Sequence, residues 1–85
     1  MRQAAVMLII KDGRILGISR RYDKTKFGLI GGKCDDGETT IQAALREVLE
    51  ETRIVVKKCT YIYSRKEPPD QNGEWFECDC FYAEE

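Results

Sequence analysis

The N-terminal part of the chain has the apolar and polar pattern of a β-hairpin. Residues 4–10 form an apolar run of β-prone side chains, and apolar residues return at 15–19. The sequence between them, Lys-Asp-Gly-Arg at 11–14, is typical of a tight turn. We therefore expect two antiparallel strands joined by this turn.

The C-terminal part carries the pattern of a second pair of strands. Residues 54–64 and 75–83 are each rich in β-branched and aromatic side chains. The segment between them contains Pro68-Pro69 and Asn72-Gly73, which favour a loop over residues 65–74. We expect the aromatic side chains of the last strand to serve core or hairpin packing rather than base stacking. They are Trp75, Phe76, Phe81 and Tyr82.

Between these strand pairs the period changes to that of an amphipathic helix over residues 39–52, with Thr39 or Thr40 as its N-cap. Taking about 100° per residue, Glu47, Glu50 and Glu51 fall within roughly 100° of arc, so three carboxylates share one face. The apolar stripe predicted to face the core lies away from that arc. It consists of Ile41, Ala44, Leu45 and Val48.

The acidic ridge formed by Glu47, Glu50 and Glu51 has two interpretations. Like charges at this spacing repel by roughly 0.2–0.5 kcal/mol per pair, and a divalent cation among them would reverse that sign. Mg²⁺ prefers oxygen ligands and usually combines one or two carboxylates with water and substrate phosphates. For a helix considered alone, a solvated charged face is the commoner explanation.

A glycine loop precedes the helix. The apolar run at 27–30 ends in Gly31-Gly32 and leads through a turn into the helix. Glycine permits unusual dihedral angles and close backbone approach, as a phosphate-cradling loop requires. The loop alone favours an ordinary tight turn, so both interpretations stay open at this point.

One spaced pattern joins the glycine pair to the acidic helix. Gly32 is followed after five residues by Glu38 and, after seven more, by Arg-Glu-Val-Leu-Glu-Glu at 46–51. This pattern resembles the Nudix box, G-x5-E-x7-R-E-U-x-E-E-x-G-U, where U is a bulky aliphatic residue. Arg53 stands where the signature has glycine, and we expect it to cost roughly 1 kcal/mol of stability, because a residue just past a helix often adopts the left-handed conformation. Ile30 also stands where the family commonly has proline.

The resemblance implies an α/β fold, with a mixed sheet in the α/β/α sandwich of Nudix domains. The chain ends before the C-terminal strands and second helix that such domains usually add. We expect one Nudix domain over residues 1–85, either minimal or truncated. Sheet edges left without neighbours favour pairing with a second copy of the chain or with the missing segment.

The resemblance also implies a reaction: hydrolysis of the diphosphate linkage of a nucleoside diphosphate joined to another moiety, assisted by Mg²⁺ or Mn²⁺. The implied metal ligands are carboxylates and glycine carbonyls: Glu47, Glu50, Glu51, Gly31 and Gly32. The implied catalytic residues are Glu38, Arg46, Glu47 and Glu50. Arg46 would hold the carboxylate geometry and Glu38 would support the loop, while the identity of the general base stays open.

Residues outside the box are implied as well. Basic side chains beside the substrate would be Arg20, Arg21 and Lys33. Many family members recruit a further acidic residue from a later segment, for which the candidates are Glu74, Glu77, Asp79, Glu84 and Glu85. None of these five occupies a convincing position in the sequence.

Composition restricts the partners. Fourteen basic and fifteen acidic side chains leave a net charge of −1, so nucleic acid is expected as a partner only if an RNA end is the substrate. No apolar run is long enough to cross a membrane, and no secretion signal is visible. The four cysteines are therefore expected as reduced thiols in the cytoplasm.

The alternative to an enzyme is a noncatalytic nucleotide- or protein-binding module on a Nudix scaffold, or an incomplete domain fragment. The intact carboxylates favour the enzyme, because a retired site has no physical reason to keep three mutually repelling charges. The short chain favours the module.

Overall fold

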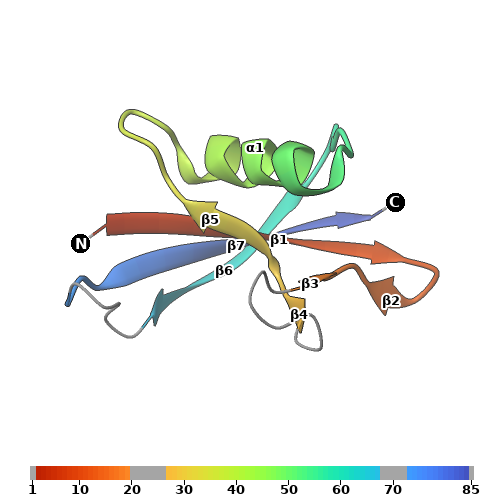
Figure 1. Cartoon of the computed structure of the whole chain (residues 1–85), viewed down its shortest axis with the longest axis horizontal. Coiled ribbons are helices and arrows are strands. Elements are labelled where there is room, and N and C mark those ends of the chain that lie inside the picture. Colours follow the sequence, from red (N-terminus) through yellow and green to blue (C-terminus); the bar gives the residue numbers. More distant parts are fainter. Residues whose placement is uncertain (1, 20–26, 68–72, 85) are drawn as a thin grey trace.

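The computed structural model, described over residues 2–19, 27–67 and 73–84, consists of a mixed sheet with one helix packed across one face (Figure 1). The elements are β1 (Arg2–Lys11), β2 (Arg14–Ile15), β3 (Ile18–Ser19), β4 (Phe27–Gly28), β5 (Ile30–Lys33), α1 (Thr40–Thr52), β6 (Thr60–Glu67) and β7 (Phe76–Glu84). The predicted α/β class with a mixed sheet is confirmed.

β1 is the centre of the sheet. Along one side it pairs antiparallel with β5 and, further along, with β2; along the other side it pairs parallel with β7. β6 is antiparallel to β7 and ends the strand order β2-β1-β7-β6. β3 and β4 form a separate two-stranded sheet.

The predicted N-terminal hairpin is present, but its second strand is shorter than expected. Asp12 and Gly13 both have positive φ, 54° and 76°, as the tight turn between β1 and β2 requires. β2 ends at Ile15, so the prediction of one continuous strand over 15–19 is wrong. β3 pairs instead with β4, where Ile18 is opposite Gly28.

The predicted strand over 54–64 is also wrong at both ends. The segment 54–59 is not a strand, and β6 runs from Thr60 to Glu67. Ile54, Val56 and Cys59 are partly buried and pack against the core. The apolar content of this segment therefore reflects core packing rather than strand pairing. β7 begins one residue after the predicted start of the last strand and ends one residue later.

The core lies between α1 and the sheet. It is built from apolar side chains of β1, β5, α1 and β7: Ala5, Met7, Ile9, Ile30, Ala43, Ala44, Val48, Phe81 and Ala83. Phe76 is also buried, whereas Trp75 is exposed and does not serve the packing predicted for it. The one helix of the described residues is too short and too polar to cross a membrane.

α1 begins and ends as its sequence suggests, and Ala44, Val48 and Leu45 of the predicted stripe pack into or against the core, whereas Ile41 does not. Thr39 is the N-cap, and with Gln42 it forms a capping box. Ile41, predicted to be buried, is 40% exposed, whereas Ala43 is fully buried. The side chain of Glu47 is only 18% exposed. Part of the acidic face of the helix is thus turned toward β5.

Candidate active site

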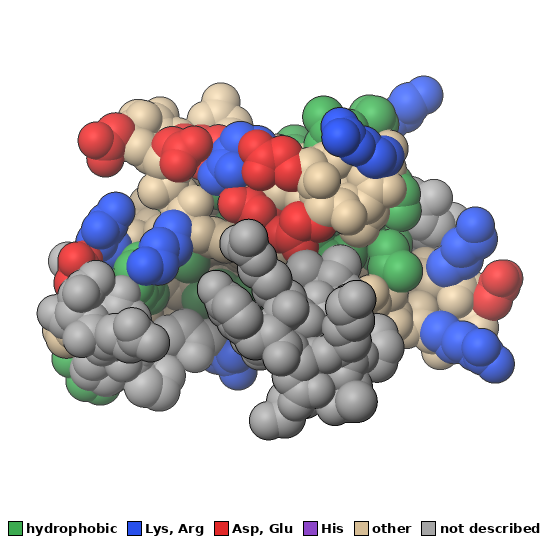
Figure 2. Space-filling model, in the orientation of Figure 1, with side chains coloured by type: hydrophobic (Ala, Val, Ile, Leu, Met, Phe, Trp, Pro, Cys, Tyr) green, Lys and Arg blue, Asp and Glu red, His purple; other side chains and the backbone are tan. Residues whose placement is uncertain are grey.

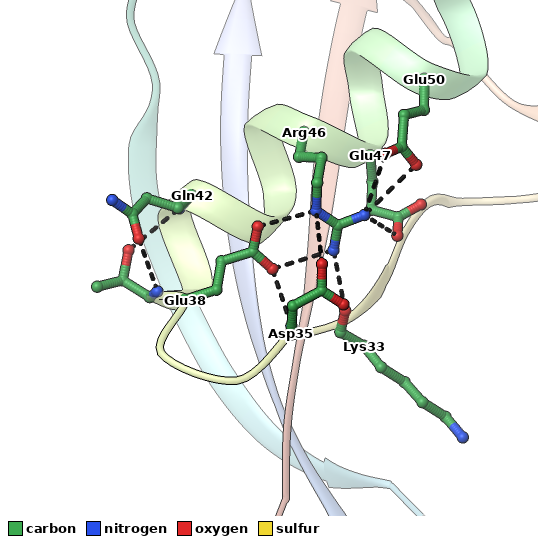
Figure 3. A network of polar contacts seen from close by, with 8 residues as sticks. Lys33, Asp35, Glu38, Gln42, Arg46, Glu47 and Glu50 are labelled. Carbon is green, nitrogen blue, oxygen red and sulfur yellow. Dashed lines mark hydrogen bonds and ion pairs between the residues drawn. The ribbon is translucent and has the colours of Figure 1, made fainter.

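Arg46 lies at the centre of a polar network between α1 and the loop that precedes it (Figure 3). Its Nε donates to Glu38 Oε2 at 2.8 Å and its Nη2 donates to Glu38 Oε1 at 3.0 Å, so the ion pair is bidentate. Nη2 also donates to the backbone carbonyl of Lys33 at 3.2 Å. Nη1 donates to Glu47 Oε1 at 3.0 Å and to Glu50 at 3.4 Å. One side chain therefore connects the end of β5, the loop and the acidic face of the helix.

Glu38 is fixed from both sides. Besides the two bonds from Arg46, its Oε1 accepts a hydrogen bond from the backbone N–H of Asp35 at 2.9 Å. The Arg46 guanidinium, followed by this backbone donor, lowers the pKa of Glu38 to about 2. The same contact raises the pKa of Arg46. Both groups are thus charged at neutral pH, and they hold the loop against the helix.

The glycine pair is required by close contacts rather than by unusual dihedral angles. A Cβ on Gly32 would lie 2.5 Å from Glu47 Oε1, and a Cβ on Gly31 would lie 2.2 Å from the carbonyl oxygen of Ala5. Gly31 therefore permits β1 and β5 to pair, while Gly32 leaves space for a carboxylate. This explains how α1 can turn Glu47 toward the sheet at no steric cost.

Glu51 lies beside Glu47 in the same space. Its carboxyl group lies next to the Glu47 carboxylate and the backbone of Gly31, and both affect its protonation. Burial raises the pKa of Glu51 to about 7, and the neighbouring Glu47 carboxylate contributes to the same shift. Its Oε2 is buried and has no hydrogen-bond partner among the described residues. A buried oxygen without a partner, next to a second carboxylate, is where a cation would be most strongly stabilised.

These groups fit a hard divalent cation. Carboxylate oxygens are the ligands that Mg²⁺ prefers, and Glu47 and Glu51 supply them side by side, next to the two glycines of β5. The third predicted carboxylate, Glu50, is 57% exposed and contacts Arg46 instead. Within the described ranges, no three acidic or cysteine side chains are already grouped in the manner of a metal site. Figure 2 shows the acidic side chains gathered along and below the helix on this face.

The predicted substrate-binding cations are placed only in part. Arg20 and Arg21 lie outside the described residues. The Lys33 side chain points away from Arg46 in Figure 3. Its ammonium group lies 4.8 Å from the centre of the Phe76 ring, a cation–π contact across the sheet.

The acidic candidates outside the box lie away from Glu47 and Glu51 in the described part of the chain. Glu74 pairs with Arg2 at 3.3 Å. Glu77 lines a cavity of about 350 Å³ beside the loop 34–38. Asp79 accepts hydrogen bonds from the Thr40 and Ser64 hydroxyl groups. The Glu84 side chain and Glu85 lie outside the described residues. No sequence pattern links Thr40 with Asp79, 39 positions apart, so this contact could not be predicted.

The chain matches the NUDIX domain family over residues 1–84, and it therefore belongs to that family. The expected resemblance is thus confirmed over almost the whole chain rather than over the box alone. In the solved structure of a MutT NUDIX hydrolase from Burkholderia pseudomallei, 30% identical, the two folds agree with a TM-score of 0.83 over 99% of this chain and 67% of that one. The Escherichia coli dihydroneopterin triphosphate pyrophosphohydrolase, 22% identical, shares the fold with a TM-score of 0.83 over 98% of this chain.

Two curated relatives are similar over shorter stretches. The oxidized purine nucleoside triphosphate hydrolase of Danio rerio is 42% identical over 53 residues, which is 60% of this chain. A Bacillus subtilis (strain 168) protein, provisionally named an 8-oxo-dGTP diphosphatase, is 36% identical over 50 residues, which is 59% of this chain. Each of these matches spans 34% of the relative.

Proposed function

We propose that this chain is a Mg²⁺-dependent hydrolase that cleaves the diphosphate linkage of a nucleoside diphosphate joined to another moiety. The observation that carries the proposal is the pair Glu47 and Glu51, held side by side in front of Gly31-Gly32 with one buried oxygen left without a partner. A solvated charged face would not bury these groups. Family membership supports the same reaction class.

The proposed metal ligands are Glu47, Glu51 and Glu50, with Gly31 and Gly32 contributing backbone oxygens. A bound Mg²⁺, or Mn²⁺ in its place, would neutralise the diphosphate and lower the pKa of the attacking water. Every other contribution comes from the chain itself. Glu38 and Arg46 hold the loop and the helix together, so that the carboxylates keep their positions.

Proton transfer is the second contribution. A bound Mg²⁺ would keep the carboxylates that hold it ionised, and an ionised carboxylate beside the attacking water can accept its proton. We propose that the general base is one of the box glutamates Glu47 and Glu50.

The proposed substrate is a nucleoside triphosphate with an oxidised purine base, a class that the names of both curated relatives contain. Because the chain spans only about a third of those relatives, substrate choice is the part of the proposal that most needs a direct test. The four thiols of the chain further support a reducing compartment, and we propose the cytoplasm.

The test is release of pyrophosphate or phosphate from a panel of nucleoside triphosphates, oxidised purine nucleotides and nucleoside diphosphate derivatives, with Mg²⁺ and with a chelator. Glu51→Gln and Glu50→Gln are the matched variants, since each replaces a carboxylate by an amide of the same shape. Mg²⁺-dependent release that both variants lose would support the proposal. Well-folded protein that releases nothing from any compound would favour the noncatalytic module.

A further inference from the structure

Asp79 ties the start of the acidic helix to the sheet. Its Oδ2 accepts a hydrogen bond from Thr40 Oγ1 at 2.7 Å, and its Oδ1 accepts one from Ser64 Oγ at 2.6 Å. Thr40 is the first residue of α1, and Ser64 lies in β6, directly opposite Asp79 in the strand register. Both oxygens of one carboxylate are therefore used to connect α1, β7 and β6.

The network continues to the packing of the core. The Tyr61 hydroxyl group and Ser64 Oγ are 2.5 Å apart, and the Tyr61 ring packs edge-on against Phe81 at 5.9 Å between centroids. Asp79 thus contacts a side chain of the sheet through one oxygen and the first residue of α1 through the other. A carboxylate near a helix N-terminus is further stabilised by the helix dipole.

The end of α1 that Asp79 contacts is distant from the proposed metal ligands. Thr40 and Glu47 are seven residues apart, or roughly 10 Å along a helix axis. The position of Glu47 nevertheless depends on how the whole helix lies on the sheet, because its carboxylate occupies the space that a Cβ on Gly32 would fill. A rotation or slide of α1 at its first turn would move Glu47 out of that space.

We propose that Asp79, acting through Thr40, is a positioning residue that fixes α1 in the orientation needed for Mg²⁺ binding by Glu47 and Glu51. This inference rests on the proposed function. It gives Asp79 a role other than that of the additional metal ligand or base considered from the sequence, since both of its oxygens already accept hydrogen bonds.

The experiment is a double-mutant cycle read out as the Kd for Mg²⁺ by calorimetry, with the variants Thr40→Val, Asp79→Ala and the two combined. We expect each single variant to raise the Kd by about tenfold, the lower end of the effect of outer-shell partners on metal affinity. The Kd of the double variant should lie within about twofold of the higher of the two single-variant Kd values, because both substitutions remove the same contact.

Two further variants separate positioning from folding. Thr40→Ser keeps the hydroxyl group and should restore Mg²⁺ affinity, and Thr60→Val removes an exposed threonine hydroxyl group from β6 and should leave the affinity unchanged. If Asp79→Ala does not fold, the contrast between Thr40→Val and Thr40→Ser carries the test. A Thr40→Val protein that binds Mg²⁺ with the same Kd as the unsubstituted chain would overturn this inference and leave the proposed function standing. An unsubstituted chain that binds no Mg²⁺ would overturn the proposed function and the inference together.

Discussion

The two adjacent glycines allow the sharpest test of how the site is built, because a methyl group at each would meet a different obstacle. At Gly32, Cβ would lie 2.5 Å from Glu47 Oε1 and 2.7 Å from its Cδ, where ordinary contact begins at 3.4 Å. The obstacle is the end of a flexible side chain, which can withdraw. At Gly31, Cβ would lie 2.2 Å from the Ala5 carbonyl oxygen and 2.9 Å from Val6 Cα, which are backbone atoms of the paired strand.

These contacts give opposite expectations for two substitutions that look alike in the sequence. Gly32→Ala should change the free energy of unfolding by no more than about 0.5 kcal/mol, because the entropy gained by replacing a strand glycine offsets the displacement. Mg²⁺ needs its ligands at about 2.0–2.1 Å in near-octahedral geometry, so displacing Glu47 should raise the Kd by at least about tenfold. Gly31→Ala should destabilise the fold by about 2 kcal/mol, or roughly 8–16 °C in Tm for a chain of this size.

The assay is thermal unfolding of both variants in chelator, followed by calorimetric titration with Mg²⁺ at a temperature where each is folded. We expect Gly32→Ala to weaken Mg²⁺ binding with little change in Tm, and Gly31→Ala to lower the Tm. This expectation would be refuted by Gly32→Ala binding Mg²⁺ with the unsubstituted Kd, or by Gly31→Ala melting at the unsubstituted Tm.

Three further perturbations follow from the described contacts. Arg53 closes α1 with φ 65°, a left-handed conformation, so Arg53→Gly should stabilise the chain by about 0.5–1 kcal/mol in urea unfolding; Arg53→Ala is the control, and an equal gain there would contradict the backbone explanation. Glu38 has its pKa lowered from 4.5 to about 2, so its contribution to stability is complete above pH 4.5 and is lost as the pH falls toward 2. Melting curves of Glu38→Gln should lack that acid-induced loss, and an unchanged pH profile would remove the role given to the Arg46 pair. Glu51 has its pKa raised from 4.5 to about 7, so its contribution in metal-free protein is complete below pH 4.5 and is lost as the pH rises through 7. Glu51→Gln should flatten this part of the profile in chelator, and a slope that persists would show that another group titrates.

The acidic helix could be predicted because its periodicity and N-cap are local signals. The Glu38–Arg46 pair was expected only from the resemblance to the Nudix box, and the structure places the two side chains in contact. The N-cap is Thr39, one of the two adjacent threonines that the sequence offers for this position. Arg53 was expected in the left-handed region from its place just after the helix, and its φ confirms this.

The burial of Glu47 could not be predicted, because periodicity defines an apolar stripe but not what lies opposite. Ala44 and Val48 of that stripe are buried, while Ile41 is 40% exposed. The glycine pair of β5 leaves room for the Glu47 carboxylate, so one edge of the acidic face is buried beside the stripe. The Thr40–Asp79 contact depends on β7 lying beside β1, which is a property of the whole sheet.

The central claim is that Glu47 and Glu51 bind a divalent cation in front of the glycine pair. The most direct measurement is calorimetric titration of the metal-free chain with Mg²⁺, beside the Glu51→Gln variant of unchanged shape. The account predicts a saturable binding event in the unsubstituted chain that Glu51→Gln loses, while the melting temperature of Glu51→Gln in chelator is no lower than that of the unsubstituted chain. Equal binding by both proteins, or no binding by a folded unsubstituted chain, would contradict it.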